Sequence, residues 1–419
     1  MRMSQLFTRT LREAPKDEVS LNAQLLTKGG FIKKLSAGVY SFLPLGLRVF
    51  KKIENIIREE MDLLGGQEIL MPVLHPKELW EESGRWETAD YLYKLKDRQK
   101  AEFALGATHE EAVTDIVRKY VSSYRDLPLL VYQIQTKFRD ELRPKSGLLR
   151  GREFSMKDLY SFHKDDENRK KYYKAIENSY LKIFKRCGFN DVFVTEASGG
   201  SFSSEYSHEF QVPTDAGEDL VIYCQNCGFT QNKEICDLRQ GDDCPNCERE
   251  LKDIKTIEVG NIFSLGSKYS KPMGLSFLDS DGIAKPVVMG CYGIGLSRLM
   301  GAAAEIHNDE RGVMWPKEIS PFDFIIVQLS SNNPEVNEKI KRTAERIYER
   351  AQEKGFSVLY DDREDKGAGE KFTEADLFGI PWRVVVSERT LAENKVELKE
   401  RGQEDVILVN KGKLLESII

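Results

Sequence analysis

Three arginines occur in settings that suit the binding of a nucleoside triphosphate. Arg139 lies in the tetrapeptide FRDE, Arg150 precedes Phe154 by four residues, and Arg298 ends the sequence GIGLSR. Guanidinium groups stay charged at any working pH and bind phosphate oxygens in pairs. A phenylalanine ring offers a flat face on which a base can stack, and glycines let a ligand approach the backbone closely. A single R-x-E sequence is usually a surface ion pair, so the prediction depends on all three arginines together.

Four of the seven cysteines form two closely spaced pairs. Cys224 and Cys227 are followed by Cys244 and Cys247, and each pair has two residues between its members. This spacing is typical of a zinc ribbon with four thiolate ligands, and a closed shell of that kind predicts a structural Zn²⁺. Free thiols, or a knuckle that no longer holds metal, are the alternatives. Cys236 lies between the pairs and is not expected to be a ligand. Reduced thiols of this kind fit a cytoplasmic protein.

Eight blocks along the chain resemble the prolyl-tRNA synthetases of bacterial type, which are class II aminoacyl-tRNA synthetases. The blocks follow the family's order and cover residues 38–48, 66–76, 107–111, 133–141, 152–163, 207–210, 258–269 and 289–298. The resemblance extends from about residue 1 to residue 419. It implies a ligase that activates L-proline with ATP to prolyl-adenylate. It also implies transfer of proline to the 3′-terminal adenosine of tRNA(Pro).

The resemblance assigns ATP-binding roles to the arginines and their neighbours. Arg139 would bridge the α-phosphate and the proline carboxylate, and Glu141 would contact the adenine amino group or nearby groups. Arg150 would bind the outer phosphates. Phe154 would stack under adenine, with Arg298 on the other face and near the γ-phosphate. Because the attacking carboxylate is already an anion, the first step needs no general base, and catalysis by Arg139 and Arg298 would be positioning and charge neutralisation.

The resemblance also implies where proline and Mg²⁺ bind. Thr108 and Glu110 form a T-x-E element whose carboxylate would face the substrate amino group, because a buried unpaired cation is very costly. The other residues implied for the proline site are Arg139, Met156, Tyr160, His208, Phe263 and Cys291. Core packing is the alternative for the wall residues, and especially for His208 and Cys291. Glu209 and Glu258 are candidates for holding Mg²⁺ on ATP, since Mg²⁺ favours one or two carboxylates with phosphates.

The elements that would position these residues indicate an α+β catalytic domain built on an antiparallel sheet with flanking helices. Helices are expected over residues 45–64, 110–121, 166–187 and 294–305. Strands are expected near residues 67–71, 131–138, 152–160, 191–196, 208–212, 219–223, 257–265 and 286–292. They correspond to motif 1 (about 45–72), motif 2 (about 137–158) and motif 3 (about 289–305) of the class. Motif 1 forms the homodimer interface in this class, so a homodimer is expected.

After Trp315-Pro316 the pattern changes to alternating strands and helices. Strands at 324–329, 357–360 and 382–386 are separated by helices at 334–354 and 369–378. This order predicts a small α/β domain. It resembles the anticodon-binding domain of several class II synthetases. The expected domains are therefore a catalytic domain (1–220 and 255–317), a four-cysteine insert (221–254) and an anticodon-binding domain (320–419).

Composition limits the class of protein further. The 419 residues suffice for two or three domains, and 40% hydrophobic and 31% charged residues indicate a soluble globular protein. No apolar run approaches the roughly 20 residues that span a bilayer, so no membrane association is expected. The net charge of −6 argues against a nucleic-acid coat protein. It does not argue against tRNA recognition, in which stacking and base edges dominate.

The interval between motifs 2 and 3 departs from the family pattern. Bacterial-type enzymes usually carry a large editing domain there that removes mischarged alanine, whereas this interval is mostly residues 221–254. A compact form without editing in cis is therefore expected. A proline pocket excludes alanine weakly, because missing methylenes are worth only about 1–3 kcal/mol. A separate deacylase acting in trans is a possible partner.

Two other functions are compatible with parts of the sequence. One is a class II synthetase for threonine, serine or glycine. The THE and SHEF blocks and the lack of a catalytic zinc set argue against threonine. The other is a synthetase-like protein that binds RNA or a partner without activating an amino acid. The presence of both Arg139 and Arg298 argues against it.

Overall fold

The chain forms two compact units. The computed structural model describes residues 1–142, 144, 146–200, 202–203 and 205–418. One unit comprises Met1–Leu35, Tyr40–Lys52 and Ala303–Ile419, and the other comprises Ser36–Val39 and Ile53–Ala302. The N-terminal segment therefore groups mainly with the C-terminal part of the chain, whereas the sequence-based domains placed it with the catalytic part.

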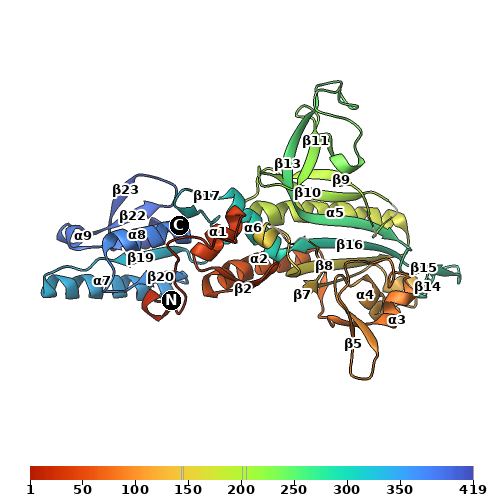
Figure 1. The fold of residues 1–419 in the computed structure, drawn as a ribbon, viewed down its shortest axis with the longest axis horizontal. Coiled ribbons are helices and arrows are strands. Elements are labelled where there is room, and N and C mark those ends of the chain that lie inside the picture. The colour runs from red at the N-terminus through yellow and green to blue at the C-terminus, as the bar shows by residue number, and fades with distance from the viewer. Residues whose placement is uncertain (143, 145, 201, 204, 419) are drawn as a thin grey trace. The chain divides into compact units, whose positions relative to one another are not determined.

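The larger unit is built on a sheet whose described strands run in the order β10-β9-β12-β11-β13-β16-β8-β7-β3 (Figure 1). Their bounds are β3 Gln67–Glu68, β7 Leu129–Phe138, β8 Glu153–His163, β9 Phe193–Ala197, β10 Ser207–Pro213, β11 Asp219–Tyr223, β12 Thr230–Asn232, β13 Lys252–Gly266 and β16 Val288–Gly295. The central strands β13, β16, β8 and β7 pair antiparallel. The predicted antiparallel α+β architecture is confirmed.

Helix α5 (Asp166–Arg186) covers one face of this sheet. Its N-cap Asp165 accepts a hydrogen bond from the backbone N–H of Asn168, and the last turn carries Lys185 and Arg186. Such residues satisfy free N–H groups and complement the helix dipole. Tyr180 and Phe184 are fully buried, and both rings pack against Phe210 of β10. Burying one large apolar side chain contributes roughly 1.5–3 kcal/mol, which fixes α5 on the sheet.

Helix α4 (Glu110–Val117) lies against the opposite face. Its buried Val113 and Val117 belong to a core cluster that includes Tyr160 and Phe162 of β8. Successive side chains of a strand point to opposite faces, so even-numbered residues of β8 face α4 and odd-numbered residues face α5. The helix ends at Val117, four residues before the predicted end, because the chain turns at Lys119–Tyr120.

Helix α2 (Pro44–Leu63) confirms the predicted helix of motif 1. Gly65 follows it with φ of +80°, a conformation that glycine adopts without strain at helix ends. The strand predicted over 67–71 is shorter, since only Gln67–Glu68 forms β3. Beyond it, the backbone of Met71 bonds with side chains, since its N–H donates to Gln133 and its carbonyl accepts from Gln135. These bonds replace a strand ladder.

The remaining described elements of the larger unit and its borders are short. They are β1 Ile32–Ser36, β2 Val39–Phe42, β4 Leu74–Pro76, α3 Lys77–Glu82, β5 Lys94–Lys96, β6 Glu102–Leu105, η2 Tyr124–Asp126, η3 Gly147–Leu149, η4 Lys233–Ile235, β14 Ser276–Leu278, β15 Ala284–Pro286 and α6 Leu296–Ile306. Helix α6 follows β16 directly, as predicted for motif 3. The motif 2 loop between β7 and β8 includes residues 143 and 145, which lie outside the described residues.

The C-terminal unit contains a sheet of strand order β20-β19-β21-β22-β23. Its elements are β19 Phe324–Gln328, α7 Pro334–Glu353, β20 Val358–Asp361, α8 Ala368–Phe378, β21 Trp382–Val386, α9 Glu388–Ala392, β22 Lys395–Glu400 and β23 Val406–Asn410. The same unit includes η1 Met3–Gln5, α1 Leu21–Lys28, β17 Asn308–Asp309, β18 Gly312–Val313 and η5 Leu414–Glu416. The parallel strands β20, β19 and β21 match the predicted strands, and β22 and β23 were not predicted.

Candidate active site

A cavity in the larger unit brings together most of the residues predicted from the sequence. The predicted residues that line it are Thr108, Glu110, Arg139, Glu141, Arg150, Phe154, Met156, Glu258, Phe263, Cys291 and Arg298. They come from the loop before α4, from the hairpin of β7 and β8, from β13, and from β16 and α6. Glu110 and Cys291, which are 181 positions apart in sequence, therefore share one chamber.

The strand register of β8 explains the shape of the cavity floor. Phe154, Met156 and Asp158 alternate along the strand and line the cavity from the same face. On the neighbouring strand β16, Gly295 pairs with Met156 and Gly293 pairs with Asp158. Because these glycines have no side chain, β16 leaves space above the floor.

Arg139 lies in the middle of the cavity without a carboxylate partner. Its Nε is 3.4 Å from the carbonyl oxygen of Ala107, and its guanidinium lies 5.2 Å from the ring centre of Phe154. Among the described residues, no carboxylate lies within ion-pair distance of it. Burial lowers the pKa of Arg139, yet a guanidinium stays charged even so. The group can therefore bind an anionic ligand without first breaking an ion pair.

Arg150 and Arg298 are paired, in contrast to Arg139. Arg150 Nε lies 3.0 Å from Glu141 Oε2, and Arg298 Nη1 lies 2.5 Å from Glu258 Oε2. Arg298 also donates from Nε to the carbonyl oxygen of Leu149 at 2.8 Å. Phosphate binding at these two arginines would compete with, or add to, an existing carboxylate pair.

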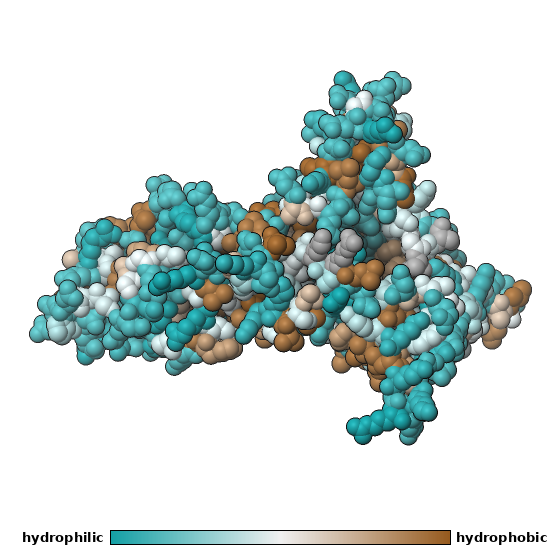
Figure 2. Space-filling view, in the orientation of Figure 1, coloured by the Kyte–Doolittle hydropathy of each residue, from teal (hydrophilic) through white to brown (hydrophobic). Residues whose placement is uncertain are grey.

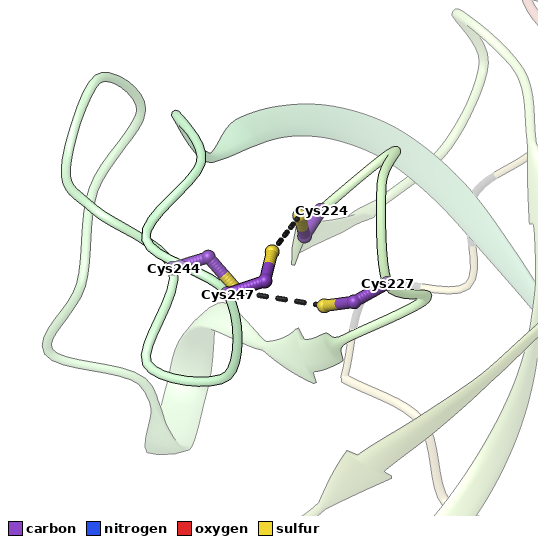
Figure 3. A group of neighbouring side chains, drawn as sticks. All are labelled: Cys224, Cys227, Cys244 and Cys247. Carbon is purple, nitrogen blue, oxygen red and sulfur yellow. Dashed lines mark hydrogen bonds between the residues drawn. The ribbon is translucent and has the colours of Figure 1, made fainter.

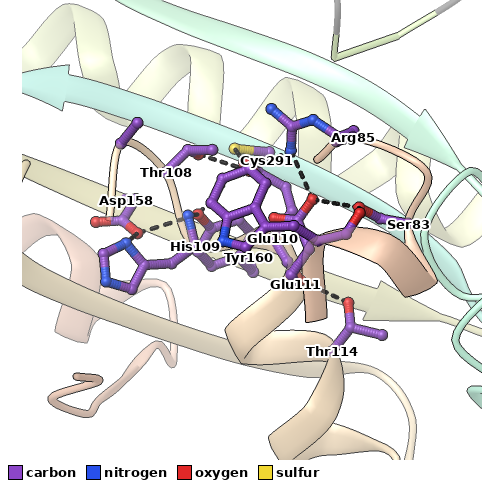
Figure 4. A network of polar contacts seen from close by, with 12 residues as sticks. Ser83, Arg85, Thr108, His109, Glu110, Glu111, Thr114, Asp158, Tyr160 and Cys291 are labelled. Atoms are coloured by element: carbon purple, nitrogen blue, oxygen red, sulfur yellow. Dashed lines mark hydrogen bonds and ion pairs between the residues drawn. The ribbon is translucent and has the colours of Figure 1, made fainter. Parts of the chain in front are cut away.

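Glu110, a fully buried carboxylate, also lines the cavity and lies in a network with Thr108, Tyr160 and Cys291 (Figure 4). It accepts hydrogen bonds from Thr108 Oγ1 at 2.6 Å, Tyr160 OH at 3.3 Å and Cys291 Sγ at 3.3 Å. Burial, and then the charge of Glu110, raises the pKa of Cys291, which keeps it a thiol and a donor. Phe263 packs against Phe202 with ring centres 5.2 Å apart and completes an apolar wall.

Tyr160, His208 and Glu209 do not line the cavity. Tyr160 lies behind the wall and reaches Glu110 only through its hydroxyl. His208 occupies the sheet face covered by α5, where its Nδ1 hydrogen-bonds Tyr173 OH at 2.7 Å, because it shares strand parity with the core residue Phe210. We therefore assign His208 no contact with a ligand in the cavity, which corrects the sequence-based expectation.

Glu209 lies next to the cavity rather than in it. Its carboxylate accepts hydrogen bonds from Asn232 at 3.0 Å and Asn261 at 3.2 Å, and Asn261 does line the cavity. Burial, and then the neighbouring charge of Glu258, raises the pKa of Glu209 to about 8. Glu209 and Glu258 are thus neighbouring carboxylates that repel each other. Such a pair forms a donor set that suits a divalent cation.

Two buried cations at the site were not predicted from the sequence. Lys137 is fully buried, with Nζ 2.7 Å from Asp158 Oδ1 and 2.9 Å from His109 Nδ1. Arg85 lies between α3 and β5 and contacts Glu110 and Glu111. Lys137 precedes the FRDE sequence and could have been suspected from that position. Arg85 lies in none of the matched blocks.

The four paired cysteines come together in the insert between β11 and β13 (Figure 3). The sulfur atoms of Cys224 and Cys247 are 3.5 Å apart, as are those of Cys227 and Cys244, and all four lie within 4.8 Å of one another. Sulfur atoms around a tetrahedral zinc ion with bonds of about 2.3 Å are about 3.8 Å apart, so this arrangement fits zinc. Cys236 is buried nearby but is not part of the set. Figure 2 shows mainly hydrophilic residues on the outer end of this insert.

Comparison with known families agrees with the fold and the site. The model of the tRNA synthetase class II core domain (G, H, P, S and T) matches residues 93–307, and the anticodon binding domain model matches residues 323–419. The fold and the cavity thus define a class II aminoacyl-tRNA synthetase.

Individual relatives narrow the class. The proline–tRNA ligase of Syntrophomonas wolfei is 36% identical over 98% of this chain and 97% of its own length. That of Aquifex aeolicus is 36% identical over 96% of this chain and 95% of its own. This chain belongs to the proline–tRNA ligase family. The predicted family and ligase class are confirmed.

Solved structures show the same fold. The prolyl-tRNA synthetase of Cryptosporidium parvum, complexed with halofuginone and AMPPNP, superposes with a TM-score of 0.78 at 18% identity, covering 95% of this chain and 75% of that one. The Giardia lamblia enzyme in complex with prolyl-adenylate gives 0.76 at 20% identity, covering 93% and 74%. No helix in the described part of the chain has the length and apolarity to cross a membrane.

Proposed function

We propose that this chain ligates L-proline to tRNA(Pro), through prolyl-adenylate made from ATP, and that it does so without editing in cis. The observation that most supports this reaction is the set of groups gathered in one cavity. The anion Glu110, the cation Arg139, the ring of Phe154 and Arg298 all line it, and Arg139 lies 5.2 Å from the centre of the Phe154 ring. A cationic amine, a carboxylate beside an α-phosphate, and an adenine match this set of groups.

Arg139 is the group to which we assign most of the activation chemistry. It would hold the proline carboxylate beside the α-phosphate and neutralise the charge that develops there. Bond formation between the carboxylate oxygen and phosphorus releases pyrophosphate, and no proton moves in this step. The described cavity residues include no serine or free amine aimed at the centre, which agrees with a reaction driven by positioning and electrostatics.

At the amino-acid end, Glu110 would pair with the secondary amine of proline while Thr108 fixes its carboxylate. Met156, Phe263 and Cys291 would surround the ring, and Tyr160 would support the carboxylate from behind. The geometry suits a small apolar ring attached to a cation, because polar contacts gather at one point and apolar side chains cover the rest.

At the ATP end, Phe154 would stack with adenine, and Glu141 and Arg298 would contact the nucleotide around it. Arg150 would bind the outer phosphates after leaving Glu141. Glu258, with Glu209 behind it, would hold Mg²⁺, which neutralises phosphate charge when bound. The raised pKa of Glu209 supports this assignment, because a cation would relieve the repulsion between the two carboxylates.

The other components follow the class. The domain at residues 323–419 would bind the anticodon loop of tRNA(Pro). Leu63 and Leu70 of motif 1 are 79% and 75% exposed, which supports a homodimer through this region. The four-cysteine insert would hold a structural Zn²⁺ in the interval where an editing domain would otherwise lie. A role in translation and reduced cysteines fit the cytoplasm.

The direct test of the proposed function is prolylation of tRNA. The purified protein should attach labelled proline to a tRNA(Pro) transcript in the presence of ATP and Mg²⁺, and it should leave a tRNA transcript of another identity uncharged. Absence of charging by folded, zinc-loaded protein would contradict the proposal.

A further inference from the structure

Arg85 is a buried arginine behind the amino-acid end of the cavity. Arg85 lies in the loop that follows α3, and it is only 5% exposed. Three aromatic rings surround the guanidinium, with ring centres 5.2 Å away in Trp80, 5.1 Å in Phe202 and 5.5 Å in Tyr269. Phe202 also lines the cavity. A cation enclosed in this way is held in one place and is shielded from water.

Arg85 is shared between two consecutive buried carboxylates (Figure 4). Its Nη1 lies 2.9 Å from Glu111 Oε1 and 3.4 Å from Glu110 Oε2. Its Nη2 donates to Tyr91 OH at 2.5 Å, which fixes the plane of the fork. Glu111 also accepts from Ser83 Oγ at 2.7 Å, so this carboxylate faces away from the cavity, whereas Glu110 faces into it.

We propose that Arg85 is a positioning residue for the amino-acid substrate, because it holds the carboxylate of Glu110 in the orientation that faces the substrate amine. The proposal rests on the proposed function and deepens it. Arg85 and its two carboxylate partners, taken together, carry a single net negative charge. That charge matches the single positive charge of an amino group. Without Arg85, two adjacent carboxylates would be buried with no cation between them.

Electrostatics supports this assignment. Burial raises the pKa of Glu111, and the charge of Arg85 is the largest influence that lowers it. The repulsion from Glu110 also raises this pKa, but by less than Arg85 lowers it. Loss of the guanidinium would therefore raise the pKa of Glu111 further. It would also remove the ion pair that holds Oε2 of Glu110.

The other titratable groups that face Glu110 do not replace Arg85. Tyr160, Tyr269 and Cys291 have pKa values raised by burial and stay neutral at pH 7. Burial lowers the pKa of His75 to about 4, so it is neutral as well.

Two lysines also face this end of the cavity. Lys137 lies 2.7 Å from Asp158 and is compensated by that carboxylate. Lys268 faces Arg85 and both glutamates, and burial lowers its pKa. Arg85, by contrast, contacts both glutamates directly.

The test is a charge-rescue series read by proline-dependent exchange of pyrophosphate into ATP. Arg85→Met should raise KM for proline about 10- to 100-fold while KM for ATP changes less than about twofold, as expected for loss of a buried charge partner. Arg85→Lys, which keeps the charge but loses the fork, should give an intermediate KM.

The double variant Arg85→Met with Glu111→Leu separates a positioning role from a structural one. Removing both partners leaves Glu110 as the single charge, so KM for proline should return toward the wild-type value. Arg118→Met is the matched control, because Arg118 pairs with Glu82 and Asp115 on the same two helices but lies outside the cavity. It should leave both KM values unchanged.

Each outcome has a distinct meaning. If wild-type protein shows no proline-dependent exchange, the proposed function fails before this inference is reached. If wild type is active and Arg85→Met or Arg85→Lys lowers kcat while both KM values change in parallel, with no rescue by Glu111→Leu, Arg85 is merely structural and the inference is overturned. If Arg85→Met does not fold, the KM for proline of Arg85→Lys decides the question: an intermediate value with unchanged KM for ATP supports the inference, and a wild-type value overturns it.

Discussion

Arg139 and Arg150 show how surroundings give the same side chain two different tasks. Arg139 is enclosed and has no carboxylate within reach, whereas Arg150 is exposed at the cavity rim and pairs with Glu141. An enclosed cation interacts more strongly with a developing anion than a solvated one. We therefore expect the central step to depend chiefly on Arg139, with Arg150 acting on the outer phosphates.

Arg139→Ala should lower kcat/KM for proline-dependent pyrophosphate exchange by about 10²- to 10³-fold, the usual cost of removing one preorganised electrostatic group. Steady-state exchange kinetics measure this directly. Arg125→Ala, which removes an exposed arginine outside the cavity, is the control and should keep wild-type rates. An active Arg139→Ala variant would disprove the assignment of the cavity.

The sequence located the cavity residues that belong to contiguous motifs and missed those that act through space. Arg85 has no neighbouring pattern, because its partners, Glu110 and Glu111, lie 25 and 26 positions further along the chain. His208 was misplaced although strand parity could have placed it correctly. His208 lies two positions before Phe210 on the same strand, so both side chains point to the same face of the sheet. The apolar side chain of Phe210 has to face the core.

At the scale of elements, the four-cysteine insert, where we propose a structural Zn²⁺, is joined to the sheet beside the cavity. Asn232, which ends β12 inside the insert, donates to Glu209 next to the cavity. The insert thus supports one wall of the cavity. A ribbon of this size buries too few apolar residues to be stable alone, so metal binding and folding should be coupled.

Replacing Cys224 or Cys247 by Ser should abolish zinc binding and lower the melting temperature. Atomic emission on purified protein should give about one zinc per chain for wild type and almost none for these variants. Cys236→Ser is the matched control, because Cys236 lies in the same insert but outside the cluster of four sulfur atoms. This variant should retain zinc. Full zinc content after loss of a paired cysteine would refute the site.

The sequence predicted long elements better than short ones. Helices α2, α5 and α7 and strands β7, β8 and β13 carry periodic apolar residues, and the structure contains all of them near their predicted bounds. Strand β5 has no buried residue, so no pattern marked it. Strand β22 does alternate, with Val396 and Leu398 buried, and the sequence-based prediction missed it. Strand β3 is short because side chains of Gln133 and Gln135 take the backbone bonds of Met71, which only the folded structure reveals.

At the scale of the whole molecule, the described interval between motifs 2 and 3 holds strands of the main sheet and the four-cysteine insert. No separate domain lies there among the described residues. Since alanine lacks only part of the proline ring, the apolar wall of Met156, Phe263 and Cys291 discriminates weakly against it. The molecule should therefore depend on other proteins for removal of mischarged alanine.

The protein alone should charge tRNA(Pro) with alanine slowly and should not hydrolyse alanyl-tRNA(Pro) faster than buffer does. Deacylation of preformed alanyl-tRNA(Pro), followed by release of labelled alanine, measures this. A full-length relative that carries an editing domain is the positive control. Rapid deacylation by this chain would show that an editing site exists within the two units.

The most direct test of the central claim is amino-acid-dependent exchange of labelled pyrophosphate into ATP with all twenty amino acids. The cavity predicts strongest exchange with proline, weak exchange with alanine, and little with threonine, serine or glycine. This pattern would show that the anion at Glu110, the cation at Arg139 and the apolar wall select one small cyclic amine. Exchange strongest with another amino acid, or none from folded and zinc-loaded protein, would contradict the account.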